Sequence, residues 1–267
     1  MKLEVLLSVM NLNKKDLNKM NITSKCTVIN QCGKNKYEKY KNFNIYSYNE
    51  LGAANSRNRG LEHITEDIIL LCDDDVVYNK GYEKKVLEEF KKNKKADVII
   101  FNFESPNRKK RRIKKAKRMH IYNSLHYATC NIAFRRKSIK NIKFNPMFGP
   151  NGTYGKAGGD DTMFLVSCLK NKLKIYSCPI FLGTVYHDKS TWFKDYNEKF
   201  FYDKGALFTG ISKTFRIPLF IQFLLRHKEF LNNIKFSKAY KLMIQGSNDY
   251  ITRYKNMEMG KWTKEYL

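Results

Sequence analysis

The chain has 267 residues and carries 51 Lys and Arg against 25 Asp and Glu, so its formal net charge is +26. Hydrophobic residues make up 42% and aromatic residues 14%, which is enough to build a core and excludes a chain disordered throughout. The charge favours an anionic partner such as nucleic acid, lipid headgroups or a phosphorylated small molecule. A coding bias toward Lys, Asn and Ile explains the same charge equally well.

Neither the cysteines nor the apolar segments indicate a secreted or membrane-spanning protein. None of the six cysteines forms a Cys-x-x-Cys pair, so neither a zinc site nor a secreted disulfide framework has support. The opening "MKLEVLLSVMNLN" is typical of a first strand rather than a signal peptide. The apolar stretch 217–225 is far short of the roughly 20 residues that a membrane span needs. We therefore expect a cytoplasmic protein.

Apolar, β-branched segments alternate with helical patterns through the first hundred residues. Most of these segments are too continuously apolar for a sheet with one wet face, which favours a parallel sheet covered by helices. Tyr82, Val86 and Phe90 follow the i, i+4, i+8 spacing of a helix face. The pattern predicts a doubly wound, mostly parallel α/β sheet that binds ligands beyond the carboxyl ends of its strands. The predicted strands are 3–9, 26–30, 44–48, 67–72 and 97–103.

The second half of the chain is less regular. Residues 131–139 read as a strand and a turn, and "LKIYSC" (173–178) as a strand that ends before Pro179. Between them, the loop 145–161 holds five of the 14 glycines and could fold closely over a ligand and move. The loop ends in Asp160 and Asp161, which open a helix. From about residue 195 the pattern is helical, basic and aromatic.

Nine of the eleven residues from 108 to 118 are basic. Such a run indicates an exposed loop or a helix that lies against something anionic, but a solvated insertion with no partner fits as well.

Three adjacent carboxylates, Asp73, Asp74 and Asp75, follow directly on the apolar run 67–72. Neighbouring carboxylates raise one another's pKa unless a cation neutralises them. Oxygen ligands of this kind suit Mg²⁺ or Mn²⁺, which complete their coordination with substrate phosphates. The triplet therefore predicts a metal–diphosphate site, with a solvated acidic turn as the alternative.

Two segments resemble glycosyltransferase family 2. "ELGAANSRNRGLEHITEDIILLCDDDV" (50–76) is similar to the family's helix, strand and D-x-D motif, and "GGDDTMFL" (158–165) to its later acidic pair. Together they cover roughly residues 3–190. The resemblance implies a GT-A fold, which is a Rossmann-like doubly wound sheet, and an inverting enzyme that uses a metal-bound nucleotide sugar.

The resemblance also implies roles for the acidic triplet and its neighbours. Asp73 would contact the donor ribose and share in the metal site, and Asp75 would hold the cation, while Asp74 occupies the motif's variable position on the donor side. Arg57 would lie near the base or phosphates of the donor, and Asn58 would support the turn.

The later acidic pair implies the proton acceptor. Asp161 would act as general base for the acceptor hydroxyl, with Asp160 beside it. Acids at a helix start also cap the helix and favour its dipole, so one of the two is expected to do only that.

Further candidates come from the loops. His187 would approach the metal or the diphosphate, although a lone histidine is as often a structural hydrogen bonder. Trp192 would stack on an acceptor sugar or belong to the core. Gly158 and Gly159 are weaker candidates for acceptor contacts.

The chain departs from the family pattern in three places. "INQCGKN" (29–35) replaces the family's Asp-rich turn, so the amides of Asn30 or Gln31 would have to read the nucleotide base. The later pair is Asp-Asp rather than Glu-Asp. The Gln-x-x-Arg-Trp signature of processive members is absent, so we expect one sugar to be added per binding event.

The resulting hypothesis is an inverting, metal-dependent transfer of one sugar, with UDP as the expected nucleotide, to a glycan or lipid-linked acceptor in bacterial surface polysaccharide synthesis. A metal-dependent nucleotidyltransferase is the nearest alternative. A nucleic-acid-binding protein using residues 108–118 leaves the acidic triplet unexplained, so a nucleic-acid partner is not expected. A glycoside hydrolase needs two carboxylates but no metal.

We expect a catalytic domain over 1–194 and a helical extension over 195–267. The catalytic domain would comprise a donor half (1–105), a basic insertion (106–118) and an acceptor half (119–194). In 196–231, aromatic and aliphatic residues interleave with Lys and Arg, as in helices that lie on anionic membranes. The protein would then be peripheral on the inner face of the cell membrane; an ordinary helical cap over the sheet is the alternative.

Overall fold

A computed structural model describes residues 1–106, 112–186, 196–231 and 234–258. The chain divides into two compact units, and each has its own core. The first unit comprises residues 1–144 and 164–190, and the second comprises 145–163 and 191–267. The second unit therefore contains the glycine-rich loop 145–161. The sequence analysis instead places this loop in a catalytic domain that ends at residue 194. That domain division stays a prediction.

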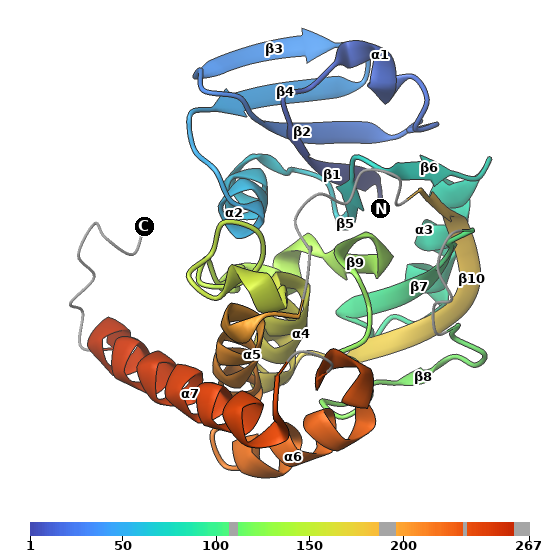
Figure 1. The fold of residues 1–267 in the computed structure, drawn as a ribbon. Helices are drawn as coiled ribbons and strands as arrows, with labels where there is room; N and C mark the ends of the chain where they lie inside the picture. The colour runs from blue at the N-terminus through green and yellow to red at the C-terminus, as the bar shows by residue number, and fades with distance from the viewer. Residues whose placement is uncertain (107–111, 187–195, 232–233, 259–267) are drawn as a thin grey trace. The chain divides into compact units, whose positions relative to one another are not determined.

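The first unit is built on one sheet, which has ten strands in the described part of the chain, in the order β3-β4-β2-β1-β5-β9-β7-β10-β6, with β8 paired to β10 (Figure 1). Strands β4, β2, β1, β5, β7 and β10 run in one direction, and β3, β9, β6 and β8 run against them. The bounds are β1 Leu3–Met10, β2 Lys25–Gln31, β3 Lys36–Tyr40, β4 Phe43–Tyr48, β5 Ile68–Asp73, β6 Val76–Tyr78, β7 Val98–Glu104, β8 Lys117–Arg118, β9 Ile132–Arg135 and β10 Ile175–Val185. The predicted doubly wound, mostly parallel sheet is confirmed.

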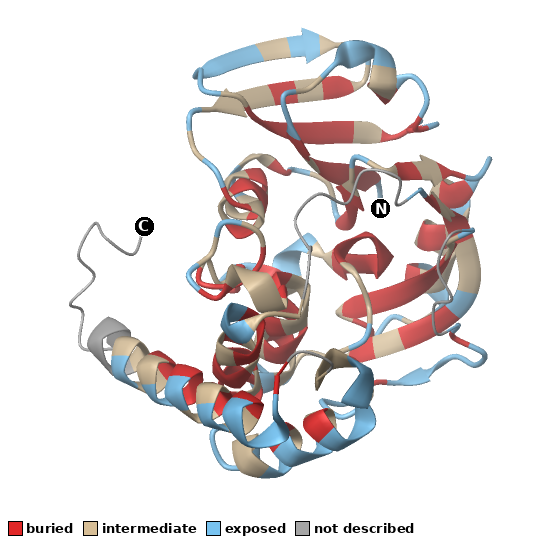
Figure 2. Cartoon of the chain, viewed as in Figure 1, coloured by how far each residue is buried: buried red, intermediate tan, exposed pale blue. Residues whose placement is uncertain are grey.

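Helices cover both faces of this sheet. Tyr82, Val86 and Phe90 of α3 (Tyr82–Lys92) are buried in the apolar cluster on one face, as their spacing predicted. Ala54 of α2 (Ala53–His63) and Phe164 of α4 (Asp160–Lys170) are buried in the cluster on the other face. Figure 2 shows the central strands in red, the colour of buried residues. Shorter helical segments are α1 Lys14–Leu17, η1 Thr129–Asn131 and η2 Arg136–Ile139.

Helix α2 packs unusually closely on β1, and a glycine permits it. A Cβ added to Gly60 would collide with the side chain of Leu6 on β1. One turn earlier, the hydroxyl oxygens of Ser56 and Ser8 lie 2.7 Å apart and form a hydrogen bond between the helix and the strand end. Arg57 and Asn58, in the same "SRNRG" segment, are thereby fixed against the carboxyl end of β1.

The strand predicted over 173–178 does not stop before Pro179, and this expectation was wrong. Strand β10 continues to Val185, with an interrupted register between Ser177 and Phe181 on its parallel partner β7. Pro179 lies in this irregular stretch, where a residue without an N–H costs no ladder hydrogen bond. Its carbonyl accepts a hydrogen bond from the Asn102 side chain, 3.0 Å away, which holds the two strands together across the interruption.

The described part of the basic run, 112–118, is an exposed loop that leads into β8, not a helix. Ile113 is its one buried residue, and it exchanges two hydrogen bonds with the Asn102 side chain, at 2.9 and 3.0 Å. Arg112 pairs with Glu104 at 2.9 Å. The run is therefore tied to β7 at its buried residue Ile113, and its basic side chains remain exposed.

The second unit is helical beyond residue 195, as the sequence predicted. It consists of η3 Gly155–Ala157, α5 Glu198–Ile211, α6 Arg216–Arg226, η4 Lys228–Leu231 and α7 Phe236–Glu258. Helices α5 and α7 cross closely because Gly205 faces the Met243 backbone and Gly246 faces the Tyr202 backbone, with no room for a side chain at either glycine. Phe201, Phe220 and Met243 are fully buried in the core of this unit. No helix in the described residues is both long and apolar enough to cross a membrane.

Candidate active site

The predicted donor-site residues of the first unit meet at the carboxyl ends of neighbouring strands. The register pairs Ser8 of β1 with Asp73 of β5, and Val9 of β1 with Asn30 of β2. Gln31 ends β2 beside Tyr48, the last residue of β4. Parallel strands align their carboxyl ends, so the acidic triplet and the two amides lie along one edge of the sheet.

Asp73 is held by an ion pair with Arg57. The Arg57 Nη2 atom lies 2.8 Å from the Asp73 Oδ1 atom. The Arg57 side chain is only 8% exposed, whereas Asp73 is 32% exposed. The guanidinium carbon also lies 5.6 Å from the centre of the Phe144 ring. The pair therefore fixes Asp73 at the strand end while leaving part of its carboxylate accessible to a ligand.

Asn58, next to Arg57 on α2, makes a reciprocal pair of hydrogen bonds with the backbone of Phe144. Its Nδ2 atom donates to the Phe144 carbonyl at 2.9 Å, and its Oδ1 atom accepts from the Phe144 amide at 2.8 Å. The Phe144 ring stacks on Phe164 at 4.3 Å between ring centres. Asn58 thus fixes the chain segment on which the Arg57 side chain packs.

Asp74 and Asp75 form the turn between β5 and β6. Asp74 is exposed, and Asp75 is half-buried. The carbonyl of Asp75 accepts a hydrogen bond from the amide of Tyr186, 2.8 Å away, where the chain leaves β10. His187 and Trp192 lie outside the described residues.

The amides of Asn30 and Gln31 are buried and form hydrogen bonds with loops at the strand ends. Asn30 accepts from the Leu12 amide at 2.9 Å and donates to the Ser47 hydroxyl at 3.1 Å. Gln31 accepts from the Gly52 amide, the residue before α2, at 2.8 Å. These contacts shape the edge of the sheet, and the expected role of the two amides in reading the nucleotide base stays a prediction.

The second acidic pair belongs to the second unit, where it opens α4 as predicted. Asp160 is buried, and a Cβ at Gly149 would lie 2.7 Å from its carboxyl carbon. The Asp161 Oδ1 atom accepts from the Thr162 amide at 2.6 Å.

Gly159 has φ +96° and its Cα faces Leu207 of α5, so a side chain there would be both strained and crowded. The shape of the turn thus depends on its glycines, and the acceptor role expected for Gly158 and Gly159 stays a prediction.

The loop before Asp160 is anchored by both long helices of its unit, through residues that the sequence analysis missed. The buried Asp203 carboxylate on α5 accepts from the Lys156 amide at 2.9 Å and from Lys199. The buried Tyr154 donates its hydroxyl to Asp249 of α7 at 2.9 Å. The i, i+4 spacing of Lys199 and Asp203 was the one sequence signal for this anchor.

Lys204, also missed, lies near Asp161 in a largely aromatic setting. Its ammonium is 5.2 to 5.9 Å from the ring centres of three phenylalanines, and 3.4 Å from the carbonyl of Ala157. Burial lowers the pKa of Lys204 to about 8, and the negative charge of Asp161 works in the opposite direction. The three phenylalanines are Phe200, Phe208 and Phe223.

The acidic turn at the end of β5 offers carboxylate oxygens to the expected metal. In the described part of the chain no group of three His, Cys, Asp or Glu side chains is arranged to hold a metal ion. The available ligands are carboxylate oxygens of a single acidic turn, which suit Mg²⁺ or Mn²⁺ because these ions take several ligands from water and substrate phosphates. The residues therefore fit a cation that binds together with a diphosphate.

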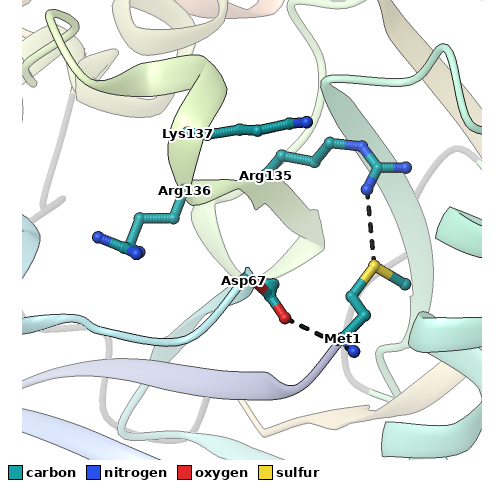
Figure 3. Close-up of a pocket in the computed structure, with 5 residues that line it drawn as sticks. All are labelled: Met1, Asp67, Arg135, Arg136 and Lys137. Atoms are coloured by element: carbon teal, nitrogen blue, oxygen red, sulfur yellow. Dashed lines mark hydrogen bonds and ion pairs between the residues drawn. The ribbon is translucent and has the colours of Figure 1, made fainter.

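A separate cavity of about 340 Å³ lies where Met1 precedes β1 and Asp67 precedes β5 (Figure 3). There the Met1 amino group lies 3.7 Å from Asp67, and Arg135 points toward the Met1 sulfur. Arg135 also donates to the carbonyls of Ala96 and Phe90. The cavity lies at the amino ends of the parallel strands, opposite the acidic triplet. The backbone hydrogen bonds of Arg135 stabilise the fold there.

Comparisons with known proteins identify the family and the fold of the chain. The family model described as Glycosyl transferase family 2 matches residues 3–153, so the chain belongs to that family and is a glycosyltransferase. No curated protein matches the chain at a significant level.

Solved structures of TarS from S. aureus have the same fold. TarS 1–349 in complex with UDP-GlcNAc superposes with a TM-score of 0.65 at 16% identity, over 94% of this chain and 81% of that one. A second structure of TarS 1–349 gives 0.61 at 14% identity, over 99% and 93%. TarS 1–349 in complex with UDP gives 0.56 at 15% identity, over 99% and 76%. At this identity the likeness establishes the fold, which is the predicted GT-A architecture.

Proposed function

We propose that the protein transfers one sugar from a nucleoside diphosphate sugar, with UDP as the nucleotide, to a hydroxyl of a glycan or lipid-linked acceptor. The observation that carries the proposal is the Arg57–Asp73 pair at the carboxyl end of β5, in a chain of glycosyl transferase family 2. The partly exposed Asp73 carboxylate can accept hydrogen bonds from ribose hydroxyls, and Arg57 holds it in place. The likeness to TarS in complex with UDP-GlcNAc supports the choice of donor class.

Asp75, with Asp73, would hold Mg²⁺ or Mn²⁺, and Asp74 would remain a donor-side residue of the turn. Such a cation, when bound, neutralises the charge that develops on the departing diphosphate. The protein's part is to keep the acidic turn in place, and the hydrogen bond from the Tyr186 amide to the Asp75 carbonyl supports this role. We include His187 as a further metal or diphosphate contact because it follows Tyr186 directly in the sequence.

Asp161 is the proposed general base, with Asp160 as its structural neighbour. The acceptor oxygen would attack the anomeric carbon as the bond from that carbon to the diphosphate oxygen breaks, and Asp161 would take the hydroxyl proton. One such displacement inverts the anomeric configuration. Acceptor contacts would come from Gly158, Gly159 and Trp192.

The place of the reaction is part of the proposal. We infer a role in bacterial surface polysaccharide synthesis, in the cytoplasm and at the inner face of the cell membrane, with 1–194 as catalytic domain and 195–267 as helical extension. The absent Gln-x-x-Arg-Trp signature supports the addition of a single sugar per binding event.

A screen of nucleotide sugars with Mn²⁺ or Mg²⁺ tests the proposal. We expect release of a nucleoside diphosphate, faster when the cognate acceptor is present. Release of pyrophosphate from a nucleoside triphosphate would instead favour the nucleotidyltransferase. If a metal chelator leaves turnover of the nucleotide sugar unchanged, the metal is removed from the proposal and the sugar transfer remains.

A further inference from the structure

Helix α6 presents apolar residues on two opposite sides. Phe220 and Leu224 are buried in the core of the second unit. On the other side, Phe215, Pro218, Ile221 and Leu225 follow one another at intervals of three, three and four residues and are all exposed. This spacing places the four side chains along one stripe of the helix surface.

The exposure of the stripe is large for apolar side chains. Phe215 is 64% exposed, Leu225 56% and Ile221 42%. Figure 2 shows exposed residues in pale blue along α6. Single exposed apolar residues are common, but a continuous row of them on a helix marks a surface that binds something.

Basic residues flank the stripe in the sequence. Between residues 212 and 231 the sequence has four Lys or Arg and a single acid, Glu229, whose carboxylate lies 3.1 Å from His227. Arg216 and Arg226 are the end residues of α6, and Lys213 and Lys228 lie just beyond them. Apolar side chains flanked by cations fit an interface in which hydrocarbon lies directly beneath anionic groups.

We propose that the stripe Phe215–Pro218–Ile221–Leu225 is the membrane-docking surface of this protein, and that it binds the headgroup region of bilayers rich in anionic lipid. The inference rests on the proposed use of a lipid-linked acceptor and adds the place of contact. A second copy of the chain fits the surface less well. Two stripes in contact would bring Arg216, Arg226 and their neighbours against the same residues of the other copy, in a protein whose net charge is already +26.

Vesicle co-sedimentation of the full chain tests the proposal. The probes are vesicles of phosphatidylglycerol mixed with phosphatidylcholine, compared with phosphatidylcholine alone. We expect the anionic vesicles to bind at least about tenfold more tightly, with the difference shrinking as salt is raised. The variant Ile221→Ser with Leu225→Ser should lose about tenfold or more of this binding, because the stripe then has little apolar surface to insert.

Two controls keep the test specific. Leu51→Ser removes an apolar side chain as exposed as Leu225 (56% each) but in the first unit, and it should bind vesicles like the parent protein. Arg226→Gln with Lys228→Gln should weaken binding to anionic vesicles and leave the small binding to neutral ones unchanged. Circular dichroism of each variant shows whether the fold is retained.

Three results would overturn the proposal. The double serine variant could bind anionic vesicles as well as the parent does, or the parent could prefer neutral vesicles. The parent could also be a dimer in solution that the double serine variant converts to a monomer, which would assign the stripe to a second copy. Transfer of the sugar to a soluble acceptor, measured without vesicles as release of nucleoside diphosphate, should persist in the double serine variant, so failure of docking and failure of the proposed reaction are distinguishable.

Discussion

The guanidinium of Arg57 lies 2.8 Å from the carboxylate of Asp73, and this pair joins the middle of α2 to the end of β5. The arginine is the more buried partner, so the pair presents a fixed carboxylate at the carboxyl end of β5. Both residues lie in the segment 50–76 that resembles the family pattern, which makes the pair the most direct target for mutation.

Replacement of Arg57 by alanine should raise the KM for the nucleotide sugar about tenfold or more, because Asp73 loses the group that orients it. A loss of stability of about 1–3 kcal/mol should accompany it, since a mostly buried partner is removed. Initial rates against donor concentration and thermal unfolding measure the two effects. Arg59→Ala is the matched control: its pair with Glu50 is partly exposed, so both quantities should change little.

Asp75→Ala should abolish the activation by Mn²⁺ and lower turnover at saturating donor by about a hundredfold or more. Asp74→Ala changes the neighbouring carboxylate, which is exposed in the same turn, and should retain most activity. Activity titrated with Mn²⁺ in both variants separates the two roles. Equal losses in the two variants would mean that the turn acts only through its overall negative charge.

Asp161→Asn should reduce kcat by about 10²–10⁴-fold with little effect on the KM of the donor, because the hydroxyl proton then has no acceptor. Asp160→Asn is the comparison. Its buried side chain packs against Gly149, so we expect a lower melting temperature and less than about a tenfold change in kcat. The reverse ranking of the two variants would transfer the role of base to Asp160.

The free energy of unfolding of the wild type, compared with that of the variant Lys204→Met, should increase between pH 7 and pH 10. Burial lowers the pKa of Lys204 to about 8 in the folded chain, against 10.5 as its ordinary value. The unfolded chain therefore binds more protons between these values, and stability increases with pH by at most about 3 kcal/mol. Urea unfolding of both proteins at several pH values measures the difference. If the difference in free energy of unfolding between the two proteins stays constant with pH, the ammonium of Lys204 is solvated in the folded chain.

The strands with continuous apolar sequence were predictable because local composition alone favours a buried strand. Strand β3, "KYEKY", was missed, since its residues are largely exposed and only the antiparallel pairing with β4 makes it a strand. Strand β6, "VVY", was too short to give a pattern. The insertion of β9 between β5 and β7 depends on tertiary pairing that no local signal carries.

The candidate site was predictable where residues lie within a motif and not where contacts join distant segments. The acidic turn and the acids that open α4 were found directly from the sequence. The pairing of Asn58 with the backbone of Phe144 spans 86 residues, so it has no local signature. Asp203 was missed because a buried carboxylate in a helix with several charged residues looks like a surface residue until its partner, the Lys156 amide, is known.

The hydrogen bond from the Tyr186 amide to the Asp75 carbonyl makes that amide a natural reporter on the acidic turn. Its proton can exchange with deuterium only when this bond opens, so its exchange rate measures how often the turn separates from the end of β10. A ligand that rigidifies the turn would slow this single exchange rate, and its binding could be followed in a protein that is given no acceptor and forms no product.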